Sequence, residues 1–65
     1  MILNLEALEV GAVVRLKDGA LVRATENPGD GMWVTGTYLE SEKEPALVGT
    51  EDLVFGEMIA EQVTN

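Results

Sequence analysis

Two short apolar segments on either side of a glycine-containing turn constrain the fold of this chain most. Residues 12–16 (Ala-Val-Val-Arg-Leu) and 20–24 (Ala-Leu-Val-Arg-Ala) flank Lys-Asp-Gly at 17–19. Both segments are rich in aliphatic and β-branched residues, which favour strands, and the residues between them favour a tight turn. The sequence therefore predicts a β-hairpin over residues 12–24.

Two registers of this hairpin compete. A two-residue loop places Val14 opposite Arg23, whereas a three-residue loop places Val14 opposite Val22 and leaves one face wholly apolar. Because a slip of one residue turns every side chain to the other face, this clean separation favours the three-residue loop. That loop needs a left-handed residue at its last position, which Gly19 supplies. The predicted inner residues are Ala12, Val14, Leu16, Ala20, Val22 and Ala24, and the outer ones are Val13, Arg15, Leu21 and Arg23.

The remaining segments are short and separated by turn residues. Asn4 is expected to cap a short turn over residues 5–8, and Pro28-Gly29 marks a polar loop over 25–31. Residues 32–39 predict a strand with a bend or bulge at Gly36. We expect a solvated turn over 40–44, a short strand over 46–48 behind Pro45, and a helical turn over 49–53 capped by Thr50. The tail, residues 54–63, fits either a helix or a strand. Gly56 argues against a continuous helix, so we favour a strand over 58–63.

Several short strands joined by Gly/Pro turns predict a mainly all-β fold, either a small sandwich or a small barrel. The chain has 65 residues and forms one domain, residues 1–65. Such a domain buries only about 60% of its unfolded surface. Cysteine is absent, so disulfides do not stabilise it, and good packing or self-association must do so.

Several glycine-and-aliphatic runs carry a family resemblance. Residues 8–11, 14–19 and 33–36 resemble the opening of an SH3-like small barrel, and residues 47–49 and 52–56 are similar to short uncharacterised proteins of actinobacterial phages. The barrel resemblance implies five strands with a short helical turn before the last one. The phage resemblance implies a host-cytoplasmic setting with no settled activity.

The charge balance limits the partners. The chain has 12 acidic and 4 basic residues, a net charge of −8, which repels nucleic acid and anionic lipid. No apolar run approaches the length of a membrane span, and the first residues carry no positive charge ahead of Glu6. We therefore expect a cytoplasmic protein with no direct nucleic-acid or membrane partner.

The side chains that commonly carry catalysis are scarce. The chain has no histidine and no cysteine, and Ser41 lies in an acidic turn. Carboxylate pairs such as Glu40 with Glu42, or Glu57 with Glu61, would need a cleft that a chain of this length has little room to form. We expect no enzyme activity and no cofactor or metal, with the acids forming a solvated surface.

The loop at residues 27–31 (Asn-Pro-Gly-Asp-Gly) allows two interpretations. Its glycines could direct amides at an anion, or the loop could be a plain turn that leads into a strand. Glu26 and Asp30 would repel phosphate, and the loop lacks the Lys and Ser/Thr of a phosphate loop. Together with the Asn27 oxygen, these acids offer at most a weak cation site, because calcium needs more oxygen ligands.

The interaction candidates lie on the outer hairpin face. Arginine beside aliphatic residues is typical of interface patches, although exposed arginines also pair with surface glutamates at little gain in stability. Trp33 is either a core residue or, if exposed, the best hot-spot candidate. The predicted interaction residues are Val13, Arg15, Leu21, Arg23 and Trp33.

These observations favour a non-enzymatic interaction module that self-associates or docks on a protein partner. Two other classes remain open. One is an acidic DNA mimic that inhibits a basic nucleic-acid-binding protein, and the other is a small-ligand binder at an oligomer interface.

Overall fold

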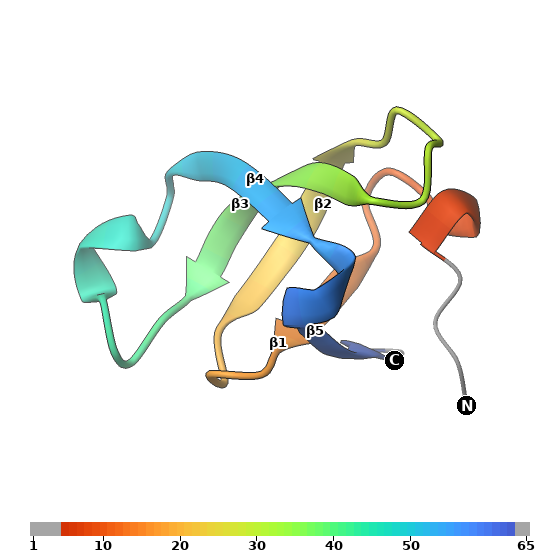
Figure 1. Ribbon diagram of the computed structural model, residues 1–65. Helices are drawn as coiled ribbons and strands as arrows, with labels where there is room; N and C mark the ends of the chain where they lie inside the picture. The colour runs from red at the N-terminus through yellow and green to blue at the C-terminus, as the bar shows by residue number, and fades with distance from the viewer. Residues whose placement is uncertain (1–4, 64–65) are drawn as a thin grey trace.

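In the computed structural model, which describes residues 5–63, five antiparallel strands form one sheet (Figure 1). The spatial order of the strands is β4-β3-β2-β1-β5. The prediction of a mainly β fold with about five short strands is confirmed. The strands are β1 (Val13–Leu16), β2 (Leu21–Glu26), β3 (Trp33–Glu40), β4 (Glu51–Phe55) and β5 (Ile59–Val63), and the single-turn 3-10 helices within the described range are η1 (Leu5–Ala7), η2 (Pro45–Leu47) and η3 (Gly56–Met58).

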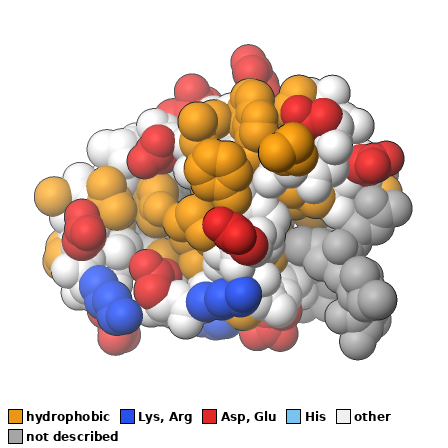
Figure 2. Space-filling view, viewed as in Figure 1, with side chains coloured by type: hydrophobic (Ala, Val, Ile, Leu, Met, Phe, Trp, Pro, Cys, Tyr) orange, Lys and Arg blue, Asp and Glu red, His pale blue; other side chains and the backbone are white. Residues whose placement is uncertain are grey.

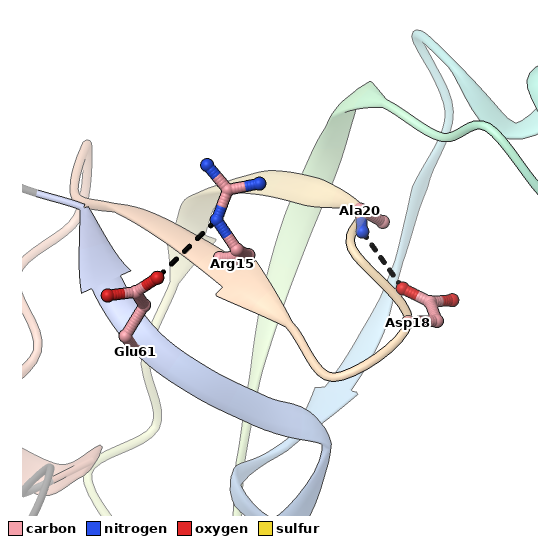
Figure 3. A network of polar contacts seen from close by, with 4 residues as sticks. All are labelled: Arg15, Asp18, Ala20 and Glu61. Atoms are coloured by element: carbon pink, nitrogen blue, oxygen red, sulfur yellow. Dashed lines mark hydrogen bonds and ion pairs between the residues drawn. The ribbon is translucent and has the colours of Figure 1, made fainter.

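The β1–β2 hairpin has the predicted three-residue loop. Val14 lies opposite Val22, and the Leu16 amide donates to the Ala20 carbonyl at 2.8 Å. Gly19 has a φ of 94°, the left-handed conformation that this loop requires. The Asp18 carboxylate accepts a hydrogen bond of 2.9 Å from the Ala20 amide and so braces the turn (Figure 3). The register argument from the sequence is therefore confirmed.

The sheet is rolled, because its two edge strands are joined by a very short link. Strands β4 and β5 lie at opposite edges, yet only η3 separates them in the chain. Five strands laid flat would span about 19 Å from edge to edge. The four Cα steps from Phe55 to Ile59 reach at most about 14 Å. The sheet must curl to bring its edges together, which forms one concave inner face.

The core lies on this inner face. Four valines, one from each of β1 to β4, are 0% exposed: Val14, Val22, Val34 and Val54. Helix η1 brings Leu5 to the same cluster, and Leu8 follows it. The buried residues are Leu5, Leu8, Val14, Leu16, Ala20, Val22, Ala24, Val34, Tyr38, Val54 and Ile59.

Gly36 lies where β2 and β3 approach most closely. A Cβ added to Gly36 would stand 2.3 Å from Val22 Cγ1 and 2.9 Å from the Arg23 carbonyl oxygen. The register between the two strands shifts between Ala24 and Glu26, directly beside Gly36. The irregularity predicted at Gly36 therefore lies in the partner strand opposite it, where Thr25 is the extra residue of β2, and Gly36 leaves room for the contact with Val22.

The predictions for residues 46–53 are wrong, because the helical turn and the strand occur in the opposite order. Residues 45–47 form η2, with Pro45 at its start, where the missing amide and the fixed φ of proline suit a helix. The Thr50 hydroxyl donates to the Leu47 carbonyl at 2.6 Å instead of capping a following turn. Residues 51–55 form β4 because they pair with β3, from Trp33 opposite Phe55 to Thr37 opposite Glu51.

The last segment agrees with the favoured alternative. Ile59–Val63 is a strand that pairs with β1, and η3 supplies the short helical turn before it. The Lys17 amide donates to the Met58 carbonyl at 2.8 Å, which ties η3 to the end of β1. The predicted cap at Asn4 lies outside the described residues.

Substitution of Gly36 tests the close approach of β2 and β3. Gly36→Ala should lower the free energy of unfolding by about 2–3 kcal/mol, because the added methyl group overlaps a buried valine and the backbone. Gly56→Ala is the matched control, since its Cβ would meet the end of the Leu5 side chain at 3.2 Å and the Met32 carbonyl oxygen at an ordinary contact distance of 3.8 Å. Urea denaturation of both variants measures the difference. Equal losses would show that the contact at Gly36 is not restrictive.

Candidate functional site

Large apolar side chains gather on the outer face of β3 and β4. Strand alternation directs Val34 and Val54 into the core and turns their neighbours outward. Trp33 lies opposite Phe55, which allows the two aromatic rings to cover part of each other. Phe55 and Leu53 remain 43% and 46% exposed, and Met32, just before β3, is 66% exposed. Met32, Trp33, Leu53 and Phe55 are called the apolar patch below.

Carboxylates surround the apolar patch. Figure 2 shows a continuous group of hydrophobic side chains on the face that carries β4, with acidic side chains around it. Glu51 shares the outer face with Leu53, Asp52 lies between them on the Val54 face at the edge of the sheet, and Glu57 follows Phe55; all three are exposed. The patch therefore combines apolar contact area with a negative rim, and an approaching surface would meet both.

Two of these carboxylates make contacts at β4 itself. Glu51 Oε2 accepts a hydrogen bond of 2.7 Å from the Thr25 hydroxyl, which reaches across β3 from β2. The same hydroxyl lies 3.2 Å from the Thr35 carbonyl. Asp52 Oδ1 accepts a hydrogen bond of 2.8 Å from the amide of Leu53, its neighbour in the chain. The first contact holds β4 against the sheet, and the second keeps a carboxylate beside the β4 backbone.

The four predicted hairpin residues do share the outer face. Val13 lies opposite Arg23, and Arg15 lies opposite Leu21. Arg15 Nε is 3.5 Å from Glu61 Oε2 on β5, and both side chains are largely exposed (Figure 3). An exposed pair of this kind contributes little to stability. Arg23 is exposed and lies opposite Thr37 of β3.

Trp33 does not belong to the same surface as Arg15. The two residues lie on strands separated by β2, and Trp33 is paired with β4 at the far end of β3. Trp33 is half-buried and is not part of the core, so its place is on the outer face beside Phe55. The structure thus divides the predicted set into a hairpin group and Trp33. Trp33 acquires Met32, Leu53 and Phe55 as neighbours that the sequence analysis did not select.

The loop at residues 27–31 uses its polar groups internally. Asn27 Oδ1 accepts from the Gly29 amide at 2.9 Å, and Asp30 Oδ1 accepts from the Met32 amide at 2.9 Å. These bonds use the amides of Gly29 and Met32 and one side-chain oxygen each of Asn27 and Asp30 within the loop itself. The interpretation of this loop as a plain turn accounts for its contacts.

Asn27 also has a role that the sequence analysis missed. Its Nδ2 donates to the carbonyl oxygens of Leu5 and Leu8, at 2.9 and 2.8 Å. The loop after β2 therefore holds η1, which places Leu5 and Leu8 over the core. An Asn before Pro-Gly is a common turn signal, and nothing local reveals partners about twenty residues away.

The other candidate acids are spread over the surface. Ser41 is buried, and its hydroxyl accepts a 3.1 Å hydrogen bond from the Glu44 amide. Burial, with smaller contributions from Asp52, Asp18 and Glu44, raises the pKa of Tyr38, so its phenol stays protonated at neutral pH. Within residues 5–63, no cluster of three or more acids is placed to hold a metal ion.

Comparisons with protein-family models, with curated proteins and with solved structures find no match to this chain. The relationship to SH3-like barrels and to actinobacterial phage proteins therefore stays a prediction. Over the described residues, no helix has the length and apolar character needed to cross a membrane.

The contacts of Asn27 lead to a stability prediction. Asn27→Asp should lower the free energy of unfolding by about 2 kcal/mol, because it replaces a donor with an acceptor facing two carbonyl oxygens. Asp30→Asn is the matched control in the same loop, since it keeps an oxygen that can accept from the Met32 amide. Urea unfolding followed by tryptophan fluorescence measures both variants. An unchanged Asn27→Asp variant would contradict the role assigned to Asn27.

Proposed function

We propose that this protein is a small non-enzymatic interaction module that binds another protein through the apolar patch on β3 and β4. The observation that carries the proposal is the pairing of half-buried Trp33 with exposed Phe55, with exposed Leu53 and Met32 beside them. Tryptophan and other aromatic residues are enriched where binding energy concentrates, and exposed apolar clusters mark interaction sites. In so small a domain, Trp33 and Phe55 would add useful burial to the core, yet both lie outside it.

The negative rim indicates the charge of the partner. Glu51, Asp52 and Glu57 flank the patch, and the whole chain carries a net charge of −8. A basic surface with an apolar centre would gain from both features, whereas a second copy would bring the same negative charge. We therefore favour a basic protein partner over self-association. This choice keeps the DNA mimic as the second candidate, since a DNA mimic also binds a basic protein.

The two candidates differ in what supplies the affinity. A DNA mimic depends on its carboxylates, so its binding should fall steeply as salt rises. A module that binds mainly through the apolar patch should lose much less affinity between about 0.1 and 0.5 M salt, because salt screens the contribution of the negative rim but not the apolar contacts. We also propose a cytoplasmic protein with an SH3-like barrel. The five strands and the turn before β5 support the barrel.

Substitution of Leu53 tests the proposal directly. Leu53→Asp should abolish retention of partners from a host lysate at about 0.3 M salt, because a carboxylate then stands in the middle of the patch. Val10→Asp is the matched control: Val10 is 64% exposed, lies outside the patch, and undergoes the same change in charge. Affinity capture with quantitative mass spectrometry compares the three proteins.

Two results would contradict the proposed function. One is equal capture of the same proteins by Leu53→Asp and the unmodified chain, after thermal unfolding has shown that both are folded. The other is turnover of a substrate by the purified protein. Light scattering of the unmodified chain at about 1 mM tests self-association, and a dimer lost in Leu53→Asp alone would assign the patch to a second copy.

A further inference from the structure

Strand β4 presents unpaired backbone groups at the edge of the sheet. Hydrogen-bonded and non-hydrogen-bonded pairs alternate along an antiparallel ladder. The Tyr38 amide donates to the Thr50 carbonyl at 2.9 Å, and the Gly56 amide donates to the Met32 carbonyl at 3.0 Å. These two bonds make Tyr38–Thr50 and Met32–Gly56 hydrogen-bonded pairs. Every second pair between them in the β3–β4 ladder is therefore hydrogen-bonded as well. The pairs that lie between hydrogen-bonded positions are Trp33–Phe55, Thr35–Leu53 and Thr37–Glu51.

The peptide groups of Glu51, Leu53 and Phe55 therefore point away from β3. On that side of β4, no strand among residues 5–63 pairs with it. The side chains of the same three residues are exposed. The edge offers a row of backbone donors and acceptors next to two exposed apolar side chains.

One of these groups is already covered by a side chain. The Leu53 amide donates to the Asp52 carboxylate at 2.8 Å. A charged side chain at this place discourages pairing with another negatively charged edge. A lysine or arginine of an added strand would attract the Asp52 carboxylate and so free the Leu53 amide for pairing. The hydrogen bond between Leu53 and Asp52 therefore favours a basic added strand over an acidic one.

We propose that β4 accepts an extended segment of a basic partner as a sixth, antiparallel strand of the sheet. This inference rests on the proposed function and names the way in which the partner is held. Backbone hydrogen bonds to an exposed sheet edge supply affinity in such complexes, and side chains at alternate positions supply specificity.

The sequence of β4 sets the pattern that the segment should have. In antiparallel register, residues opposite Phe55 and Leu53 share the outer face with the apolar patch and should be apolar. Residues opposite Asp52 and Glu51 should be lysine or arginine. Read in its own chain direction, the segment is apolar, any residue, apolar, basic, basic. A capped peptide containing Val-Thr-Val-Lys-Lys has this pattern, and Val-Thr-Val-Glu-Glu is its charge-reversed control.

A second copy fits this edge less well. Two β4 strands paired about Leu53 would place Asp52 opposite Val54 and Glu51 opposite Phe55, with no cation near either acid. Each copy also carries a net charge of −8, so the pair would bring together two negative surfaces.

Two substitutions at Phe55 separate the backbone from the side chain. Phe55 has φ −80°, close to the value that proline requires, and its amide is not part of the β3–β4 ladder. Phe55→Pro therefore removes one outward donor while it keeps the strand, and Phe55→Ala removes the same aromatic ring but keeps the donor. Thermal unfolding verifies that both variants are folded.

Binding of the Val-Thr-Val-Lys-Lys peptide is measured by NMR titration of the unmodified chain and both variants. We expect Phe55→Ala to weaken binding by roughly three-fold and Phe55→Pro by roughly ten-fold more, because the proline ring also blocks the approach of the added strand. Hydrogen exchange in the unmodified chain supplies a second readout that needs no variant. The peptide should slow exchange of the Leu53 and Phe55 amides.

The outcomes distinguish this inference from the proposed function. Equal affinities of Phe55→Ala and Phe55→Pro, or no slowing of Leu53 and Phe55 exchange, would overturn strand addition and leave docking on the apolar patch intact. Equal binding of the charge-reversed peptide, or no binding of the lysine peptide at about 1 mM, would also overturn it. Failure of the proposed function would give a different result: Leu53→Asp and the unmodified chain would capture the same partners equally.

Discussion

The contact on which the structure depends is the pairing of Val14 with Val22 on the inner face of the first hairpin. Both side chains are 0% exposed, and β1 and β2 lie in the interior of the strand order. A slip of one residue would turn Arg15 and Arg23 inward and leave their charges without solvent, which costs several kcal/mol. The turn at Lys17–Gly19 prevents this slip, so the hairpin provides a template on which β3 and β5 pair.

The shape of the sheet then decides what remains on the surface. Because η3 is short, β4 and β5 are drawn toward each other and the inner face closes around a small core. The core completely buries four valine side chains: Val14, Val22, Val34 and Val54. Trp33 and Phe55 are adjacent to core positions in the chain, but strand alternation places them outside. The apolar patch is thus a consequence of the same register that forms the core.

The acidic residues act together with this patch. A sheet edge with exposed apolar side chains is prone to pair with other copies of the same chain. Here the carboxylates of Glu51 and Asp52 lie on that strand, and Asp52 already bonds the outward amide of Leu53. The negative charge disfavours the pairing of like edges, and it is the reason why we propose a basic partner. The resistance to self-pairing and the proposed choice of partner therefore depend on the same side chains.

The sequence alone determined the features that depend on near neighbours. Alternation over residues 12–24 and the left-handed preference of Gly19 were sufficient for the hairpin, its register and the direction of Arg15, Leu21 and Arg23. Gly36 likewise indicated an irregularity in the sheet, and Gly56 argued against a continuous helix in the last segment. The expected number of about five strands agrees with the structure, although the fourth lies at residues 51–55 and not at 46–48.

Only the tertiary structure decided what depends on pairing between distant segments. Residues 49–53 look locally like a capped turn, but residues 51–55 form a strand because β3 supplies a hydrogen-bonding partner. The same pairing places Phe55 and Leu53 next to Trp33 and Thr35, and so creates a patch that no short segment contains. Asn27 reaches Leu5 and Leu8 for the same reason. Hydrogen bonds between strands and contacts between side chains about twenty residues apart in the sequence form only when the chain folds. Local propensity therefore does not predict them.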